Sequence, residues 1–136
     1  MAIQPKDCSV FIQVWVDTNA AAPGSTAGIY LVDNQLTRGS TGEGTPALMT
    51  HATQNSAVCF SVMNIDPQSS ATLEITNISS SGAFGFDGAP QRFSSHTWIG
   101  TLAKPVANAD YSLSFNITKA GGEHLSTTVS AQFQIT

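Results

Sequence analysis

Tyr111-Ser112-Leu113-Ser114-Phe115-Asn116-Ile117 is the stretch that decides the fold, because apolar and polar side chains alternate through it without a break. The same alternation returns over residues 125–135, after the turn-like sequence Lys-Ala-Gly-Gly-Glu at residues 119–123. Side chains on a β-strand point to opposite faces with a period of two, so each run buries one face and exposes the other to water. The two runs therefore predict an antiparallel hairpin closed by the Gly-Gly turn.

The rest of the chain repeats this pattern. Further strands are expected over residues 10–16, 28–33, 47–52, 56–65 and 96–102, with 56–65 central and 47–52 at a sheet edge. Another strand should point Leu73, Ile75 and Asn77 inward, and residues 17–26, 34–46, 66–69, 79–90 and 103–110 should connect the strands. No segment shows helical periodicity with caps. The sequence thus predicts one all-β domain over residues 1–136, an antiparallel sandwich of Greek-key or jelly-roll type with seven or eight strands.

Tyr111 follows a polar crossover and stands at the expected start of a strand. This position is typical of the tyrosine corner of Greek-key sandwiches, in which the hydroxyl bonds to the upstream backbone. The alternative is a tyrosine that simply packs between the sheets.

The composition excludes several classes of partner. Only 10% of the residues are charged, and the net charge of -4 with five Lys and Arg leaves no basic patch for a phosphate backbone, so nucleic acid is not expected. No apolar stretch is long enough to span a bilayer, so no membrane partner is expected. No secretory signal is visible at the start, and we expect a cytoplasmic protein in which Cys8 and Cys59 are reduced. A cleaved signal peptide would instead make a bridge between these two cysteines plausible.

No constellation in the sequence predicts catalysis, a metal or a cofactor. His51, His96 and His124 stand apart from one another and lack the close pair that begins a zinc site. Asp33-Asn34 and Asp87-Gly88 offer oxygen atoms but lack the order of a calcium loop. There is no nucleophile elbow, and the Gly-rich residues 82–88 lack the lysine and helix of a phosphate-binding loop.

One short segment combines aromatic rings with hydrogen-bonding groups. It contains Phe84 and Gln91 together with the five residues we predict as ligand-binding: Phe86, Asp87, Arg92, His96 and Trp98. An aromatic face and a few planar polar groups suit a carbohydrate ligand. The alternative is that Phe84, Phe86 and Trp98 fill the core between the sheets.

Several stretches carry a family resemblance: Val14-Trp15-Val16-Asp17-Thr18, Gly28-Ile29-Tyr30-Leu31-Val32-Asp33, Thr97-Trp98-Ile99-Gly100, the run 111–117, and Phe133-Gln134-Ile135-Thr136. In these the chain resembles the AidA/PixA inclusion-body proteins of Gram-negative bacteria. The resemblance implies an abundant cytoplasmic protein, regulated by quorum sensing or stationary phase, that packs into inclusions. It also implies glycan binding in some members, and it implies no enzymatic activity.

The leading hypothesis is therefore a non-enzymatic β-sandwich that forms homo-oligomers and binds a glycan in a lectin-like manner. Weak surface charge favours close packing of copies, and an edge strand such as residues 47–52 would supply the contact. The alternatives are a structural subunit of a phage particle or surface appendage, and a hydrolase with an unrecognised site.

Overall fold

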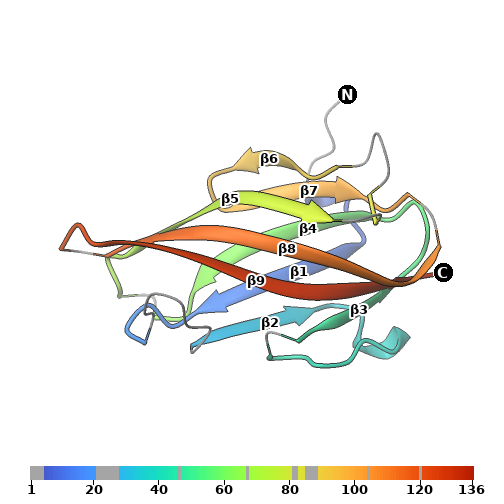
Figure 1. Cartoon of the computed structure of the whole chain (residues 1–136), viewed down its shortest axis with the longest axis horizontal. Coiled ribbons are helices and arrows are strands. Elements are labelled where there is room, and N and C mark those ends of the chain that lie inside the picture. Colours follow the sequence, from blue (N-terminus) through green and yellow to red (C-terminus); the bar gives the residue numbers. More distant parts are fainter. Residues whose placement is uncertain are drawn as a thin grey trace.

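In the computed structural model the chain forms two packed β-sheets (Figure 1). The structure describes residues 5–20, 28–45, 47–66, 68–80, 83–84, 89–103, 105–119 and 121–136. The five-stranded sheet has the order β2 (Ile29–Asp33), β1 (Val10–Val16), β4 (Ala57–Asn64), β7 (Thr97–Thr101) and β6 (Gln91–Ser94). The four-stranded sheet has the order β3 (Met49–Ala52), β9 (His124–Ile135), β8 (Val106–Thr118) and β5 (Thr72–Ser80). Two short 3-10 turns, η1 (Pro5–Asp7) and η2 (Leu36–Arg38), are the helical elements of the described residues.

This arrangement confirms the all-β sandwich. The expected hairpin is formed by β8 and β9, which pair antiparallel in register from Asp110↔Gln132 to Thr118↔His124. Two strand pairs, β1 with β4 and β3 with β9, are parallel, which an antiparallel sandwich does not include. The chain passes to the other sheet and back between β1 and β4, so it can re-enter the first sheet in the same direction.

The core lies between the sheets and is built by the alternation seen in the sequence. Along β1, Val10, Ile12, Val14 and Val16 are buried while the residues between them are partly exposed. Phe60 of β4 lies at the aromatic centre, with its ring centroid 5.6 Å from that of Tyr111 and 6.2 Å from that of Phe133. These rings meet at steep angles, the edge-to-face geometry that aromatic pairs prefer.

Three details of the strands differ from the sequence-based expectation. A bulge in β5 between Ile75 and Asn77 shifts the register, so Asn77 is exposed and Ile78 is buried instead. β8 begins at Val106, within the region expected to be a linker, and pairs with the far end of β9. Residues 91–94 form β6, a strand that was not expected because its side chains do not alternate in burial.

Tyr111 does not form a tyrosine corner within the described residues. Its side chain is only 2% exposed, and its hydroxyl oxygen is buried without a hydrogen-bond partner in that part of the chain. Its ring lies 4.7 Å from that of Phe133, so Tyr111 acts as a core residue between the sheets. Burial raises the pKa of the Tyr111 hydroxyl, and the charge of Asp33 raises it further.

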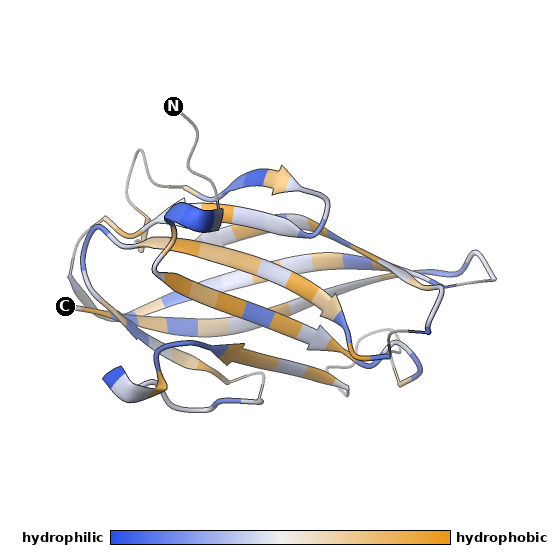
Figure 2. Ribbon diagram, turned by 180° about the vertical axis from the view of Figure 1, so that it is seen from behind, coloured by the Kyte–Doolittle hydropathy of each residue, from blue (hydrophilic) through white to orange (hydrophobic). Residues whose placement is uncertain are grey.

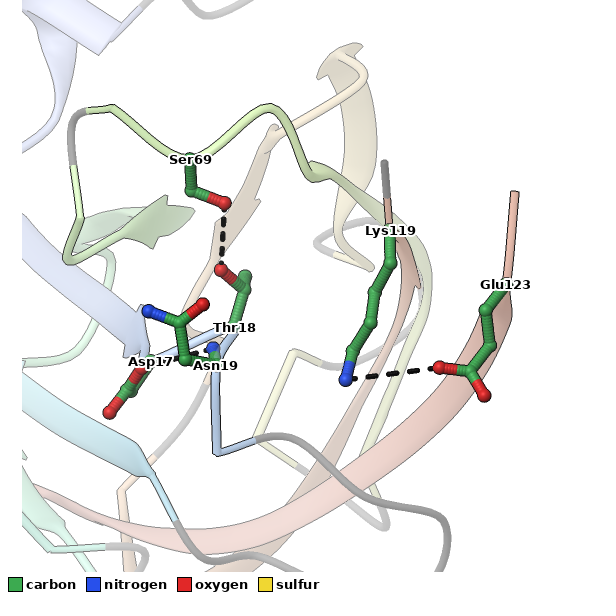
Figure 3. A network of polar contacts seen from close by, with 6 residues as sticks. All are labelled: Asp17, Thr18, Asn19, Ser69, Lys119 and Glu123. Carbon is green, nitrogen blue, oxygen red and sulfur yellow. Dashed lines mark hydrogen bonds and ion pairs between the residues drawn. The ribbon is translucent and has the colours of Figure 1, made fainter. Parts of the chain in front are cut away.

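One polar contact joins two loops of the sandwich, and another lies within the β8–β9 turn (Figure 3). The hydroxyls of Thr18, after β1, and Ser69, before β5, share a hydrogen bond of 2.9 Å. Lys119 and Glu123 form an ion pair of 3.8 Å across the β8–β9 turn. In this turn Gly122 adopts a positive φ of 87°, which explains the preference for glycine there. Within the described residues no helix is long and apolar enough to cross a bilayer.

Candidate functional site

The structure brings two of the five predicted ligand-binding residues side by side. Arg92 of β6 is the direct cross-strand partner of Trp98 of β7. His96 lies in the tight turn between these strands, is exposed, and has its ring Nδ1 3.4 Å from the Ser95 hydroxyl. Phe86 and Asp87 lie outside the described residues. The described residues of the predicted site thus lie on the β6–β7 hairpin, at one edge of the sandwich.

At this edge the two sheets are joined by an ion pair and by one backbone hydrogen bond. The Arg92 guanidinium lies 3.6 Å from the carboxylate of Glu74 on β5, with both side chains about half exposed. The backbone N–H of Ile75, also on β5, donates to the carbonyl of Ser95 at 2.8 Å. Arg92 therefore has Glu74 as an ion-pair partner, and only some of its N–H donors face the solvent.

The aromatic residues of the predicted cluster divide between core and edge. Phe84 is buried, with its ring 6.0 Å from Phe60 and 5.8 Å from Phe133, as the core-filling alternative expected. Trp98 is only partly buried and packs against the core with Leu73. Its indole Nε1 is buried without a hydrogen-bond partner within the described residues. An indole N–H is a donor that buried sites normally satisfy, so Trp98 is an exception among the described residues at this edge.

A second polar cluster joins the opposite edge of the sandwich, and sequence reasoning did not find it. Asp33, at the end of β2, accepts a hydrogen bond of 2.7 Å from the hydroxyl of Thr50 on β3. The backbone N–H of Asp33 donates to Glu43 Oε1 at 2.8 Å. The sequence indicated Asp33 as an oxygen donor of a weak calcium loop and as part of the family resemblance, and Glu43 had no signal beyond the glycines on either side of it.

Burial raises the pKa of Glu43 to about 7, and a hydrogen bond with the Asp33 side chain and the charge of that group contribute to the rise. The second carboxyl oxygen of Glu43, Oε2, is buried without a conventional hydrogen-bond partner in the described part of the chain. Two carboxyl groups that are hydrogen-bonded to each other cannot both ionise without repulsion, so one proton shared between them is favoured below the raised pKa of Glu43.

The outer face of the five-stranded sheet carries aromatic and apolar side chains. Tyr30 and Met63 flank Trp15 on neighbouring strands and form one row across the sheet with it. Tyr30 is 44% exposed, and Trp15 and Met63 are partly exposed. The central strands β1, β4 and β7 carry no charged residue, and Figure 2 shows β1 and β4 coloured largely as hydrophobic.

The outer face of the four-stranded sheet has the opposite character. It presents short polar side chains whose hydroxyls and amides bond across the strands, as Ser114 does with Thr128 at 2.8 Å and Ser126 with Asn116 at 2.8 Å. These groups satisfy one another and remain in contact with water. The two outer faces of the sandwich therefore differ sharply in polarity.

The two cysteines are unbridged and adjacent. Cys59 points to the outer face of the five-stranded sheet, where the thiol of Cys8 from the segment before β1 hydrogen-bonds with it. Burial raises the pKa of the Cys8 thiol to about 11, with the Cys59 thiol adding to the shift, and burial also raises the pKa of Cys59. Within the described residues no group of three or more His, Cys, Asp and Glu side chains is arranged to hold a metal ion.

Residues 8–125 match a family described as "Domain of unknown function (DUF8788)". The chain belongs to this family. No curated protein sequence matches it. Among solved structures, the chain is similar to the crystal structure of an inclusion body protein (PixA) from Burkholderia cenocepacia J2315. The TM-score is 0.65 at 12% sequence identity, and the match covers 98% of this chain and 99% of that chain. At this identity the likeness shows a PixA-like fold, as the resemblance in the sequence implied.

Proposed function

We propose that this member of the family is a non-enzymatic structural protein that self-associates through the outer face of its five-stranded sheet. The observation that carries the proposal is the uncharged row formed by Tyr30, Trp15 and Met63. The likeness of the fold to that of an inclusion body protein supports such a structural role for the present chain.

The composition of this face fits an interface between copies. The cores of protein interfaces are enriched in Tyr, Trp and Met and depleted of charged side chains, and contiguous exposed apolar patches mark association sites. The indole Nε1 of Trp15 donates to the amide oxygen of Gln13 at 3.1 Å, so its polar atom is already satisfied when a partner covers the ring. Burying this row therefore removes apolar surface from water without leaving the indole N–H of Trp15 unpaired.

The sheet edges fit this role less well than the face does. β3, the edge strand expected to supply the contact, does lie at the edge of the four-stranded sheet. However, Thr41 already pairs with Met49 on the free side of β3, through backbone bonds of 3.0 and 2.8 Å. A strand whose free side is partly occupied is a weaker template for pairing with another chain.

Sedimentation velocity over a range of protein concentrations tests the proposal. Because the face carries apolar rather than charged groups, we expect association that rises with concentration and persists when the salt concentration is raised. A strict monomer at high concentration would contradict the proposal. Association that disappears in high salt would also contradict it, because such an interface would depend on charges.

A second candidate function is carbohydrate binding at the edge formed by β5, β6 and β7. The observation that favours it is the pairing of Trp98, whose buried indole N–H has no hydrogen-bond partner within the described residues, with Arg92, whose guanidinium is about half exposed. An aromatic ring next to planar donors is suited to the hydroxyls and apolar face of a sugar. A glycan array followed by Trp98→Phe, which keeps the ring packing and removes the donor, tests it. Binding weakened by Trp98→Phe and unchanged by Arg38→Ala supports this candidate, and an array without hits contradicts it.

A further inference from the structure

The loop of residues 34–48 crosses from β2 in one sheet to β3 in the other and thereby closes one edge of the sandwich. Its turn is attached to the free edge of β2 at two points. The backbone N–H of Gly44 donates to the carbonyl of Leu31 at 2.7 Å, and Glu43 Oε1 accepts from the backbone N–H of Asp33 at 2.8 Å. The side chain of Glu43 thus completes the attachment that the backbone begins.

Asp33 connects this attachment to the other sheet. One carboxylate oxygen of Asp33 accepts from the Thr50 hydroxyl at 2.7 Å, and the other accepts from the backbone N–H of Gln35 at 2.8 Å. Thr50 is fully buried and Gln35 is nearly so. Both acceptor atoms of Asp33 are therefore used by donors that favour its ionised form, which makes Glu43 the partner that carries the proton.

We propose that Asp33 and Glu43 form a proton-sharing carboxyl pair that latches the loop 34–48 onto the edge of β2 and releases it when the pair loses its proton. With Glu43 neutral, its carboxyl group bonds both to the Asp33 side chain and to the Asp33 backbone. With Glu43 ionised, two like charges face each other in a partly buried site, and the buried Oε2 has no donor to compensate it within the described residues. Moving Glu43 into water relieves both costs, and this movement detaches the turn.

The neighbouring titratable groups are on β3, β8 and η2. Tyr111 of β8 is buried and is coupled to the charge of Asp33. His51 of β3 lies beside Gly39 and donates its backbone N–H to the Ser40 hydroxyl at 3.0 Å. Arg38 in η2 is exposed. Within the described residues none of these side chains bonds to the Glu43 carboxyl group, so the pair itself controls the latch. His51 is the titratable group whose contribution the experiment has to exclude.

Hydrogen exchange of individual amides between pH 5.5 and 8.5, corrected for the intrinsic pH dependence, tests the proposal. In the wild-type protein the amides of Gly44 and Asp33 should be protected at pH 5.5. Above neutral pH they should lose protection by about tenfold for each pH unit, as expected when a deprotonation accompanies opening. The amides of Val62 and Ile117 in the central strands should stay protected throughout and serve as an internal reference.

Two variants separate the latch from general destabilisation. Glu43→Gln keeps a donor toward Asp33 and an acceptor for the Asp33 N–H, so protection should persist to pH 8.5. Asp33→Asn removes the charge that opposes ionised Glu43, so protection should also persist, and it provides the answer if Glu43→Gln fails to fold. His51→Gln should behave like the wild type.

Three results would overturn the proposal. The first is protection in the wild type that does not change with pH. The second is the same pH-dependent loss in Glu43→Gln as in the wild type. The third is a return of protection at pH 8.5 on adding millimolar calcium to the wild type but not to Glu43→Gln, which would assign the pair to a cation rather than to a proton. The latch does not depend on self-association, because the protected amides belong to a single loop and strand within one chain.

Discussion

Trp15 of β1 lies directly opposite Tyr30 of β2 on the outer face of the five-stranded sheet, and both rings reach the solvent. Among the described residues this pair has no counterpart on the other outer face, where serine and threonine hydroxyls bond to one another across β8 and β9. The molecule thus has one outer face suited to contact with water. On the other outer face, covering the exposed rings with another surface lowers the free energy.

The aromatic centre of the core should dominate stability. Replacing Phe60 by alanine removes a fully buried ring that contacts Phe84, Tyr111 and Phe133, and we expect it to lower the free energy of unfolding by about 3–5 kcal/mol. Phe93 is 52% exposed, so Phe93→Ala should change that free energy by about 0.5 kcal/mol or less. Urea denaturation of both variants measures the difference, and equal losses would show that the core is not centred on Phe60.

Two glycines in the loop 34–48 allow a matched test of backbone strain. Gly42 has a φ of 78°, and a Cβ atom there would lie 2.6 Å from the Ala47 carbonyl oxygen. Gly44 has a φ of 81° but nothing within 4 Å of such an atom. Gly44→Ala should therefore cost about 1 kcal/mol from conformation alone, and Gly42→Ala should cost more because the loop must also shift. Thermal denaturation that ranks the two variants in the opposite order would contradict this geometry.

The ion pair between Arg92 and Glu74 should contribute little to stability. Both side chains are about half exposed, and solvent-exposed ion pairs contribute about 0–1 kcal/mol. A double-mutant cycle with Arg92→Ala and Glu74→Ala measures the coupling, which should weaken further in high salt. A coupling well above that range would mean that this contact, rather than the core, holds the β5–β6 edge closed.

The thiol of Cys8 should react slowly at neutral pH. Burial, together with the Cys59 thiol, raises its pKa to about 11, and the thiolate is the reactive form. A rise of this size lowers the thiolate fraction by about a hundredfold relative to an ordinary cysteine, so alkylation by iodoacetamide at pH 7.5 should be correspondingly slow. Rates measured on Cys59→Ser, which removes the neighbouring thiol, should increase. Alkylation of wild-type Cys8 at the rate of a free cysteine would contradict its burial against Cys59.

Local alternation was sufficient to predict the strands whose two faces differ in polarity. β1 and the pair β8–β9 follow it closely because each has one face in the core. It failed where a single residue interrupts the period, as at the bulge beside Asn77, and where a short strand is exposed on both sides, as in β6. The parallel pairing of β1 with β4 depends on crossings between sheets, which leave no mark on either strand.

The candidate sites likewise divide into one whose residues are neighbours in the sequence and others that only the tertiary fold brings together. Arg92 and Trp98 are close in sequence, and the hairpin β6–β7 places them opposite each other. Asp33 and Glu43 come together only because the loop folds back onto the edge of β2, and no sequence motif links the two residues. The row of Tyr30, Trp15 and Met63 likewise exists only because strand pairing brings β2, β1 and β4 side by side.

The most direct test of the proposed self-association compares one charge placed on each outer face. Tyr30→Asp puts a carboxylate in the aromatic row, and Thr128→Asp puts the same group on the hydroxyl-bearing face of the other sheet. In sedimentation velocity at high protein concentration, we predict that wild type and Thr128→Asp associate while Tyr30→Asp remains monomeric. Association of Tyr30→Asp to the same extent as the wild type would contradict the account, since the row around Trp15 would then not be the interface.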